Sequence, residues 1–352
     1  MTFSQISNNI WRSIAHDVAI DLGTANTLVH VAGKGIVMRE PSTVAIHKKT
    51  KAVLSVGTEA KKMIGKTPAS IIAIRPLRDG VISDFDVAEA MLKYFIRKVH
   101  KSRSLFDIKI PRPRVAIGIP SGVTEVERKA VVDAAIRGGA RKVFLIEEPM
   151  AAAIGANLPV EEATGSMVVD IGGGTSEVAV VSLGGIVTSR SVRVAGDEFD
   201  EAIIEWVKHN HNVLIGEKTA EEVKMAIGSA LPQEETEPLS YNIRGRDLRT
   251  GLPKQVTLTE NDLVQAIQVP LTMIIDNIKD TIEETPPEIL SDLYHSGMIL
   301  TGGGALIRRL DKRIANETKM PVFIDSDPLT TVVRGCGKAL EHIELLNKVT
   351  VM

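Results

Sequence analysis

The sequence lacks the features that mark secreted, membrane-spanning or strongly charged chains. Its 352 residues contain one cysteine, Cys336, which excludes an intramolecular disulfide and fits a reducing compartment. No segment approaches the roughly 18 consecutive apolar residues that a spanning helix needs. The N-terminal apolar positions are interrupted by Ser, Asn and Arg, unlike those of a secretory signal. Because the net charge is only −2, we expect no nucleic-acid partner. Because spanning and signal segments are lacking, we expect a cytoplasmic protein that is soluble or peripheral on a membrane.

The sequence does contain an internal duplication. HDVAIDLGTANTLVHVAGKGIVMREPSTVAI and SMVVDIGGGTSEVAVVSLGGIVTSRSVRV both read as strand, glycine turn, strand, glycine turn, strand. In both copies a glycine follows a threonine by nine residues, Thr24 to Gly33 (33 − 24) and Thr175 to Gly184 (184 − 175). The period is about the size of a domain, so it predicts two similar domains rather than a solenoid.

Each copy is later followed by a strand–helix–strand pattern. In the first half, RVAIGIP and KVFLIEE flank a helix that begins at a capping box of Thr124 and Glu127 and ends at Gly138-Gly139. In the second half, GMILTGGG and PVFID flank the helical stretch ALIRRLDKRIANE. Three antiparallel strands plus a βαβ unit, used twice, predict two α/β domains that face one another.

The remaining segments complete a predicted division of the chain. Residues 328–345 are expected to form one closing helix, and residues 1–16 a separate leading segment. The expected parts are a first domain of residues 17–39, 82–152 and 328–352 with residues 40–81 inserted, and a second domain of residues 153–194 and 258–327 with residues 195–257 inserted.

The tips of the two duplicated hairpins indicate a phosphate ligand. A structural turn needs one or two glycines, whereas Asp170 is followed closely by Gly172–Gly174 and Thr175. Backbone N–H groups of such turns bind anions, and the hydroxyls of Thr24 and Thr175 add donors. Asp21 and Asp170 beside phosphates require a bridging cation, and Mg²⁺ fits because it needs only one or two carboxylates.

Two further segments fit this chemistry. Gly302–Gly304 ends a strand and is expected to open a helix, an arrangement suited to a phosphate. Glu147 and Glu148 end a strand, and Pro149 is expected to be the first residue of a helix. A carboxylate there could orient a water toward a γ-phosphate or could simply complement the helix dipole, and the residues alone leave both open.

Five segments together resemble the actin, Hsp70 chaperone and sugar-kinase superfamily: AIDLGTANT, VVDIGGGTSEVAV, EEPMAAAIG, GDEFDEAI and ILTGGGALI. Within it, the chain is most similar to the bacterial actin homologues that determine rod shape, over residues 15–345 or so. The resemblance implies an α/β, actin-like ATPase fold. In that fold, two duplicated RNase H-like domains surround a nucleotide cleft, and each carries a smaller inserted subdomain.

The resemblance also implies roles for individual residues, with ATP and Mg²⁺ as cofactors. Glu148 would position the attacking water, assisted by Thr175, and Asp21 and Asp170 would hold a hydrated Mg²⁺. Ser176 and Ala195 stand where the pattern often has Thr and Gly, but neither change removes a catalytic group. The residues expected to bind the nucleotide are Thr24, Ala25, Asn26, Gly172, Gly173, Gly174, Thr175, Gly196, Glu221, Lys224, Gly302, Gly303, Gly304 and Ala305.

The function that the resemblance implies is a cytoskeletal ATPase. ATP-bound subunits would join head to tail into paired filaments on the inner face of the cell membrane. There they would direct cell-wall synthesis through membrane-bound elongation proteins. Three alternatives stay open: a small-molecule kinase of the same superfamily, an Hsp70-type chaperone, for which the chain leaves no room after its ATPase part, and a scaffold that binds ATP without turning it over.

Two segments carry signals of membrane contact. Phe3, Ile6, Ile10, Trp11 and Ile14 form one apolar helical face, which could lie in a membrane interface. Leu105 and Phe106 lie in an expected loop within residues 97–114, where seven Lys or Arg stand against one acid. Each basic residue near an anionic leaflet contributes about 1 kcal/mol. A disordered leader, a helix docked on the protein body and an ordinary solvated basic surface remain alternatives.

We predict that deleting residues 2–14 and changing Leu105 and Phe106 to Ser weakens co-sedimentation with anionic liposomes. The reason is that both changes remove the apolar side chains that would enter the interface. Undiminished binding would contradict the membrane assignment.

Overall fold

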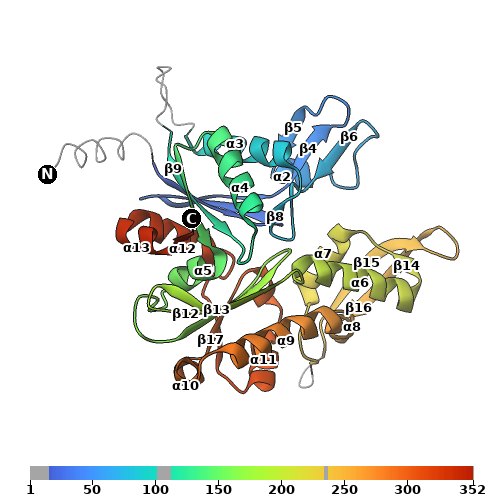
Figure 1. Cartoon of the computed structure of the whole chain (residues 1–352). Helices are drawn as coiled ribbons and strands as arrows, with labels where there is room; N and C mark the ends of the chain where they lie inside the picture. The colour runs from blue at the N-terminus through green and yellow to red at the C-terminus, as the bar shows by residue number, and fades with distance from the viewer. Residues whose placement is uncertain (1–15, 101–111, 234–236, 352) are drawn as a thin grey trace. The chain divides into compact units, whose positions relative to one another are not determined.

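The computed structural model describes residues 16–100, 112–233 and 237–351 (Figure 1). The residues expected to contact a membrane all lie outside this set: Phe3, Ile6, Ile10, Trp11, Ile14, Leu105 and Phe106. The chain forms two compact units, a first unit of Met1–Ala163, Val181–Ile186 and Thr330–Met352 and a second of Thr164–Val180 and Val187–Leu329. The finer division into inserted subdomains stays a prediction.

The first unit is built on a six-stranded sheet. Central strands β1 and β9 are buried along almost their whole length, so helices cover both faces of the sheet. Strand β1 runs antiparallel to β2 and parallel to β9, and β9 runs parallel to β10. The strand order is β19 (Thr350–Val351), β10 (Lys142–Glu147), β9 (Arg114–Ile119), β1 (Val18–Leu22), β2 (Asn26–Val31) and β3 (Gly35–Pro41).

Four helices of the first unit enclose this sheet. α4 (Glu125–Gly138) packs against α3 (Phe85–His100) and joins β9 to β10. Its expected capping box is confirmed, because the Thr124 side chain accepts a hydrogen bond from Glu127 N–H. On the other side, α12 (Thr331–Glu341) packs against β1, β2 and α5 (Glu148–Gly155), as Figure 1 shows.

The contact between α5 and α12 is unusually close. A Cβ atom at Gly335 would collide with the carbonyl of Ala151, and one at Gly155 would collide with that of Thr331. Glycine at both positions lets the two helix backbones touch. Since Glu148 is the first residue of α5, this contact also fixes the start of the helix that carries it.

The single closing helix expected over residues 328–345 is wrong. The segment forms α12 and a separate α13 (Ile343–Val349), with His342 between them in an extended conformation. A second small difference concerns Pro149, which lies at the second rather than the first position of α5.

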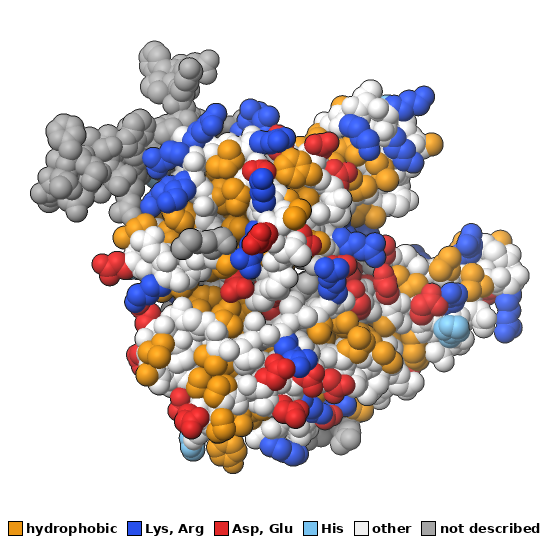
Figure 2. All heavy atoms as spheres, viewed as in Figure 1, with side chains coloured by type: hydrophobic (Ala, Val, Ile, Leu, Met, Phe, Trp, Pro, Cys, Tyr) orange, Lys and Arg blue, Asp and Glu red, His pale blue; other side chains and the backbone are white. Residues whose placement is uncertain are grey.

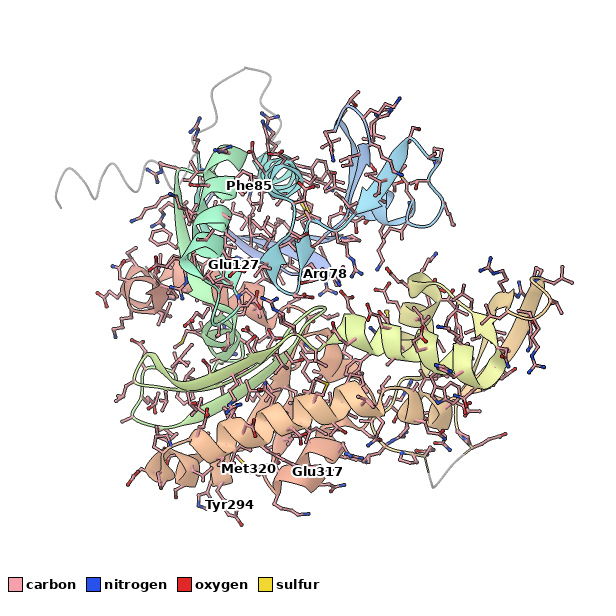
Figure 3. The ribbon with its side chains drawn as sticks, turned by 45° about the vertical axis from the view of Figure 1, so that its right-hand side comes forward. Arg78, Phe85, Glu127, Tyr294, Glu317 and Met320 are labelled. Carbon is pink, nitrogen blue, oxygen red and sulfur yellow. The ribbon has the colours of Figure 1, made fainter. Side chains whose placement is uncertain are left out.

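The rest of the first unit consists of short elements. A three-stranded sheet has the order β5 (Val53–Val56), β4 (Val44–His47) and β6 (Ile71–Ile74), and α2 (Thr58–Lys61) follows β5. A tight hairpin joins β7 (Leu77–Arg78) to β8 (Val81–Ile82), with both Asp79 and Gly80 at positive φ, as a type I′ turn requires. Arg78, which precedes this turn, is labelled in Figure 3.

The main sheet of the second unit has five strands, and their order repeats that of β3, β2, β1, β9 and β10 in the six-stranded sheet of the first unit. Two antiparallel connections are followed by strands that run parallel, since β11 pairs in parallel with β17 and β17 with β18. The order is β13 (Gly185–Val192), β12 (Ser176–Ser182), β11 (Ser166–Ile171), β17 (Met298–Thr301) and β18 (Val322–Ile324). The predicted internal duplication is therefore confirmed in the topology.

Helices and a three-stranded sheet of order β14, β15 and β16 complete the second unit around one large apolar core. Asp280 and Glu284 of α9 (Gln268–Glu284) form ion pairs with Arg190, and Figure 2 shows acidic and basic side chains intermixed on the face in view. The elements are α6 (Gly196–His211), β14 (Val213–Leu214), α7 (Glu217–Ile227), β15 (Ser240–Asp247), β16 (Pro253–Thr259), α8 (Glu260–Ala266), α9 (Gln268–Glu284), α10 (Pro287–Ser296) and α11 (Leu310–Thr318).

The helix expected to start at Ala305 differs from the one observed. Residues Gly303–Leu306 form a single 3₁₀ turn, Ile307 is extended, and α11 begins only at Leu310. The interruption arises at Arg309, whose φ of 59° is left-handed and cannot continue an α-helix. The glycine cluster therefore opens a 3₁₀ turn, so the expected α-helix N-terminus there is wrong, while its contact with the nucleotide stays a prediction.

None of the helices in the described part of the chain is long and apolar enough to span a membrane.

Candidate functional site

In the first unit, the structure brings Asp21 and Glu148 to the same strand end. Asp21 lies opposite Gly118 in the register of β1 and β9. A Cβ atom at Gly118 would lie 3.4 Å from Cγ of Glu148 and 3.8 Å from Sγ of Cys336. Burial raises the pKa of the Cys336 thiol well above its usual value, and the negative charges of Asp21 and Glu148 raise it further. Both carboxylates expected to act on phosphate or water are therefore close to one buried thiol.

The adjoining hairpin tip is held by two residues that the sequence did not single out. The buried Ser42 donates its hydroxyl to the carbonyl of Gly23 and its backbone N–H to that of Ala25, at 3.0 Å. Gly80 N–H donates to Oγ1 of Thr24 at 3.1 Å, so the Thr24 hydroxyl can still donate its own proton. The Asp79-Gly80 pair is a hairpin-turn signal in the sequence, but nothing there says what the turn contacts.

In the second unit, Asp170 is the penultimate residue of β11 and is buried, with 6% of its surface exposed. Burial raises the pKa of its carboxyl to about 7. Its register partner on β17 is Thr301, and the next residue, Gly302, has a φ of 78°. Any side chain at Gly302 would collide with the Asp170 carboxylate, so glycine there is required both by the backbone and by this close approach.

The loop after β11 is attached to the N-terminus of α6. Within the loop, Gly172 N–H donates to the carbonyl of Thr175 at 2.9 Å. From α6, Gly196 N–H donates to the Gly172 carbonyl at 3.2 Å, and Asp197 N–H donates to the Gly173 carbonyl at 2.7 Å. Gly196, one of the residues expected to bind the nucleotide, thus lies directly against the glycine loop.

Lys224 of α7 connects the same helix start to a buried acid. Its Nζ donates to the Gly196 carbonyl at 2.6 Å and lies 2.9 Å from Oδ1 of Asp200. Burial raises the pKa of Asp200 to about 6, against the lowering effect of Lys224, while the charges of Glu221 and Asp197 raise it further. Asp200 was missed, although GDEFDEAI places it four residues after Gly196, on the same face of a helix.

These groups suit a hydrated cation rather than a fully protein-built metal cage. Across the described ranges, no group of three or more His, Cys, Asp or Glu could hold a metal ion by itself. Mg²⁺ needs few protein ligands when phosphate oxygens and water complete its octahedron. The buried Asp170 carboxyl fits such an ion, because a cation beside it would favour the charged form.

The two topologically equivalent sheets, each with an acid at a hairpin tip, define an actin-like fold. The profile of the family described as MreB/Mbl protein matches residues 15–348. Cell shape-determining protein MreB of Escherichia coli (strain K12) is 54% identical over 335 residues, which cover 94% of this chain and 95% of that protein. The chain belongs to the MreB/Mbl family and is an actin-like cytoskeletal protein with a role in cell shape.

Solved structures agree with this assignment. MreB5 of Spiroplasma citri bound to AMPPNP is 38% identical with a TM-score of 0.87, and the match covers 94% of this chain and 97% of that one. A MamK double helical filament gives a TM-score of 0.78 at 21% identity, covering 93% of this chain and 99% of the MamK chain, and supports the fold alone.

We predict that wild-type stability rises relative to the Asp200→Asn variant as pH falls from 7 to 5. Because the folded pKa of Asp200 is raised to about 6, the folded chain binds a proton at this carboxyl as the pH falls below about 6. In the unfolded chain the carboxyl stays charged until the pH approaches its ordinary pKa near 4. The gain should be about 1 kcal/mol, measured by urea unfolding without nucleotide at each pH.

The variant Lys224→Met provides a second arm of this measurement. Since the Lys224 charge lowers the pKa of Asp200, its removal should move the rise in stability to higher pH. If the free energies of unfolding of wild type and Asp200→Asn change in parallel between pH 7 and 5, the raised pKa of Asp200 is contradicted.

Proposed function

We propose that the chain binds ATP with Mg²⁺ and hydrolyses it, and that nucleotide state controls its assembly into filaments. The observation that carries the proposal is the buried carboxyl of Asp170, packed against Gly302 beside the glycine loop Gly172–Gly174. A carboxylate in that position is costly unless a cation accompanies it. A phosphate-bound Mg²⁺ supplies such a cation, and the similar MreB5 of Spiroplasma citri binds the ATP analogue AMPPNP.

The proposed roles follow the arrangement inside each unit. In the first unit, Thr24, Ala25 and Asn26 hold terminal phosphates, and Asp21 holds water on the Mg²⁺. In the second unit, the glycine loop and Thr175 bind phosphate, Asp170 holds the cation, and Gly196 binds the nucleotide. Two elements bind the nucleoside: the pair Glu221 and Lys224, and the segment Gly302–Ala305.

Glu148 is the proposed catalytic residue, with Thr175 assisting it. Its side chain lies at the end of β9 near Asp21, so an ordered water near the Mg²⁺ ligands would be within its reach. A carboxylate there orients the water and accepts a proton as it attacks the γ-phosphate. Glu148 is the first residue of α5, and its carboxylate therefore lies at the positive end of the helix dipole.

The proposed cellular role extends the family membership. Head-to-tail contacts between identical subunits generate open filaments, because such interfaces do not close on themselves. We propose paired filaments on the inner face of the cell membrane that direct cell-wall synthesis through membrane-bound partners and so maintain a rod shape. Membrane contact through residues 1–16 and through Leu105 and Phe106 is part of this proposal.

The main experiment measures phosphate release from Mg·ATP against protein concentration with anionic liposomes present. Release that starts only above a threshold concentration supports hydrolysis triggered by assembly. Release proportional to protein from zero upward would contradict the filament proposal and favour a monomeric kinase or chaperone-type ATPase. Binding of ATP without release would favour a scaffold.

We predict that Glu148→Gln lowers phosphate release by about 100-fold or more, because the amide cannot accept the proton. The affinity for AMPPNP should stay within about threefold of wild type, since the substitution preserves shape. The matched control is Glu147→Gln, which changes the neighbouring half-buried acid on the adjacent strand end and should leave turnover nearly unchanged. Equal loss in both variants would contradict the role of Glu148.

A further inference from the structure

Two arginines follow the 3₁₀ turn at Gly303–Leu306, and the first binds the end of α7. The guanidinium of Arg308 donates to the carbonyl of Ala226 at 2.8 Å. Its backbone N–H donates to the carbonyl of Gly228 at 3.2 Å, and its carbonyl accepts from Ala230 N–H at 2.8 Å. The segment around Arg308 is thus joined to the segment that ends α7 by a short parallel bridge.

The guanidinium of the second arginine, Arg309, donates hydrogen bonds through all three of its nitrogens, mainly to the segment that follows α7. Nε donates to the carbonyl of Leu231 at 3.0 Å and Nη1 to Oε1 of Gln233 at 2.7 Å. Nη2 donates to Oγ of Ser229 at 2.7 Å and forms an ion pair with Glu260 of α8. Glu260 is 2% exposed, so removal of Arg309 would leave a buried carboxylate without this ion-pair partner.

The backbone of Arg309 is in an unfavourable conformation, and the bonds of its side chain must offset the free-energy cost of that conformation. Its φ of 59° is unfavourable for any residue with a Cβ atom and favours glycine or asparagine. No local turn chemistry accounts for an arginine there. The four side-chain bonds are the feature that holds this conformation and, with it, the break before α11.

These bonds connect the two elements that the proposed function assigns to the nucleoside. Glu221 and Lys224 lie on α7, whose last turn includes Ala226. Gly302–Ala305 lies immediately before Ile307 and the two arginines. All of these residues belong to the second unit. The separation of α7 from Gly302–Ala305 is therefore set by Arg308 and Arg309, which we call the arginine clamp.

We propose that the arginine clamp is a positioning device for the nucleoside end of the ATP site. This inference rests on the proposed ATP binding and adds residues that need not touch the nucleotide. Arg308 and Arg309 act through α7 and the 3₁₀ turn. The phosphate-binding loop Gly172–Gly174 is bonded instead to Gly196 and Asp197 at the start of α6. It meets α7 indirectly, because the Gly196 carbonyl accepts from Lys224, and its bonds go to residues other than Arg308 and Arg309.

The arginine clamp should therefore affect the affinity for ATP and not the affinity for tripolyphosphate. ATP needs both the nucleoside-binding elements and the groups that hold phosphate and Mg²⁺, whereas inorganic tripolyphosphate with Mg²⁺ needs only the groups that hold phosphate and Mg²⁺. Loss of the clamp should weaken ATP and leave tripolyphosphate unchanged, while general loss of structure would weaken both. The ratio of the two dissociation constants is the readout that a merely structural role would not move.

The test uses Arg309→Gly in the full-length protein, because glycine accepts the left-handed backbone and removes only the side-chain bonds. We expect the dissociation constant of Mg·ATP to rise about tenfold or more, with that of Mg·tripolyphosphate within about twofold of wild type. Arg309→Lys keeps the charge opposite Glu260 but loses the fork, so it should give an intermediate ATP affinity.

The matched control is Lys319→Gly, at the opposite end of α11. Lys319 has the same φ of 59° and an exposed cationic side chain, and it lies between Glu317 and Met320, both labelled in Figure 3. Its substitution relieves the same backbone constraint outside the clamp, so both affinities should match wild type.

The outcomes separate the two proposals. Wild-type protein that binds tripolyphosphate but not ATP would overturn the proposed function and the clamp with it. If wild type binds ATP and the Arg309→Gly variant binds it equally tightly, the positioning role of the clamp is overturned and the proposed function is not. Parallel loss of both ligands in Arg309→Gly and in Arg309→Lys, with lowered thermal unfolding temperatures, would show a structural role and contradict the clamp as well.

Discussion

The buried carboxyl of Asp170 is the constraint on which the site in the second unit depends. Parallel pairing of β11 with β17 sets Thr301 beside it, and the next residue must then be glycine with a left-handed backbone. Burial leaves the carboxyl with a pKa of about 7, so its charged form costs free energy in the chain alone. A bound cation removes that cost, which couples the stability of the unit to its ligand.

The duplicated sheets carry different chemistry at equivalent positions. In the first, Asp21 lies opposite Gly118, and the side chains of Val332 and Glu148 occupy the space beside that glycine. In the second, Asp170 lies opposite Thr301 and packs against Gly302. In one copy the topology thus gives a half-buried acid, Asp21, with the carboxylate of Glu148 near it. In the other it gives a buried acid, Asp170, packed against glycine.

Much of this organisation could be predicted from the sequence because it depends on local signals. The duplicated hairpins, the capping box at Thr124 and the acids Asp21 and Asp170 all follow from spacing and turn chemistry. Contacts distant in sequence could not be predicted, such as Gly80 on Thr24. The break at Arg309 was missed because its apolar and charged neighbours fit a helix, while tertiary bonds from Ser229, Leu231 and Glu260 impose the left-handed backbone.

The most direct measurement counts the protons released when Mg·ADP binds, by calorimetry in buffers of different ionisation enthalpy. If a cation restores the charge of Asp170, binding at pH 7 releases about half a proton, since the carboxyl is then half protonated in the free chain. The release should grow toward one proton near pH 6 and fall toward zero above pH 8. Binding without proton release at pH 7, or a release that is constant over this range, would contradict the account.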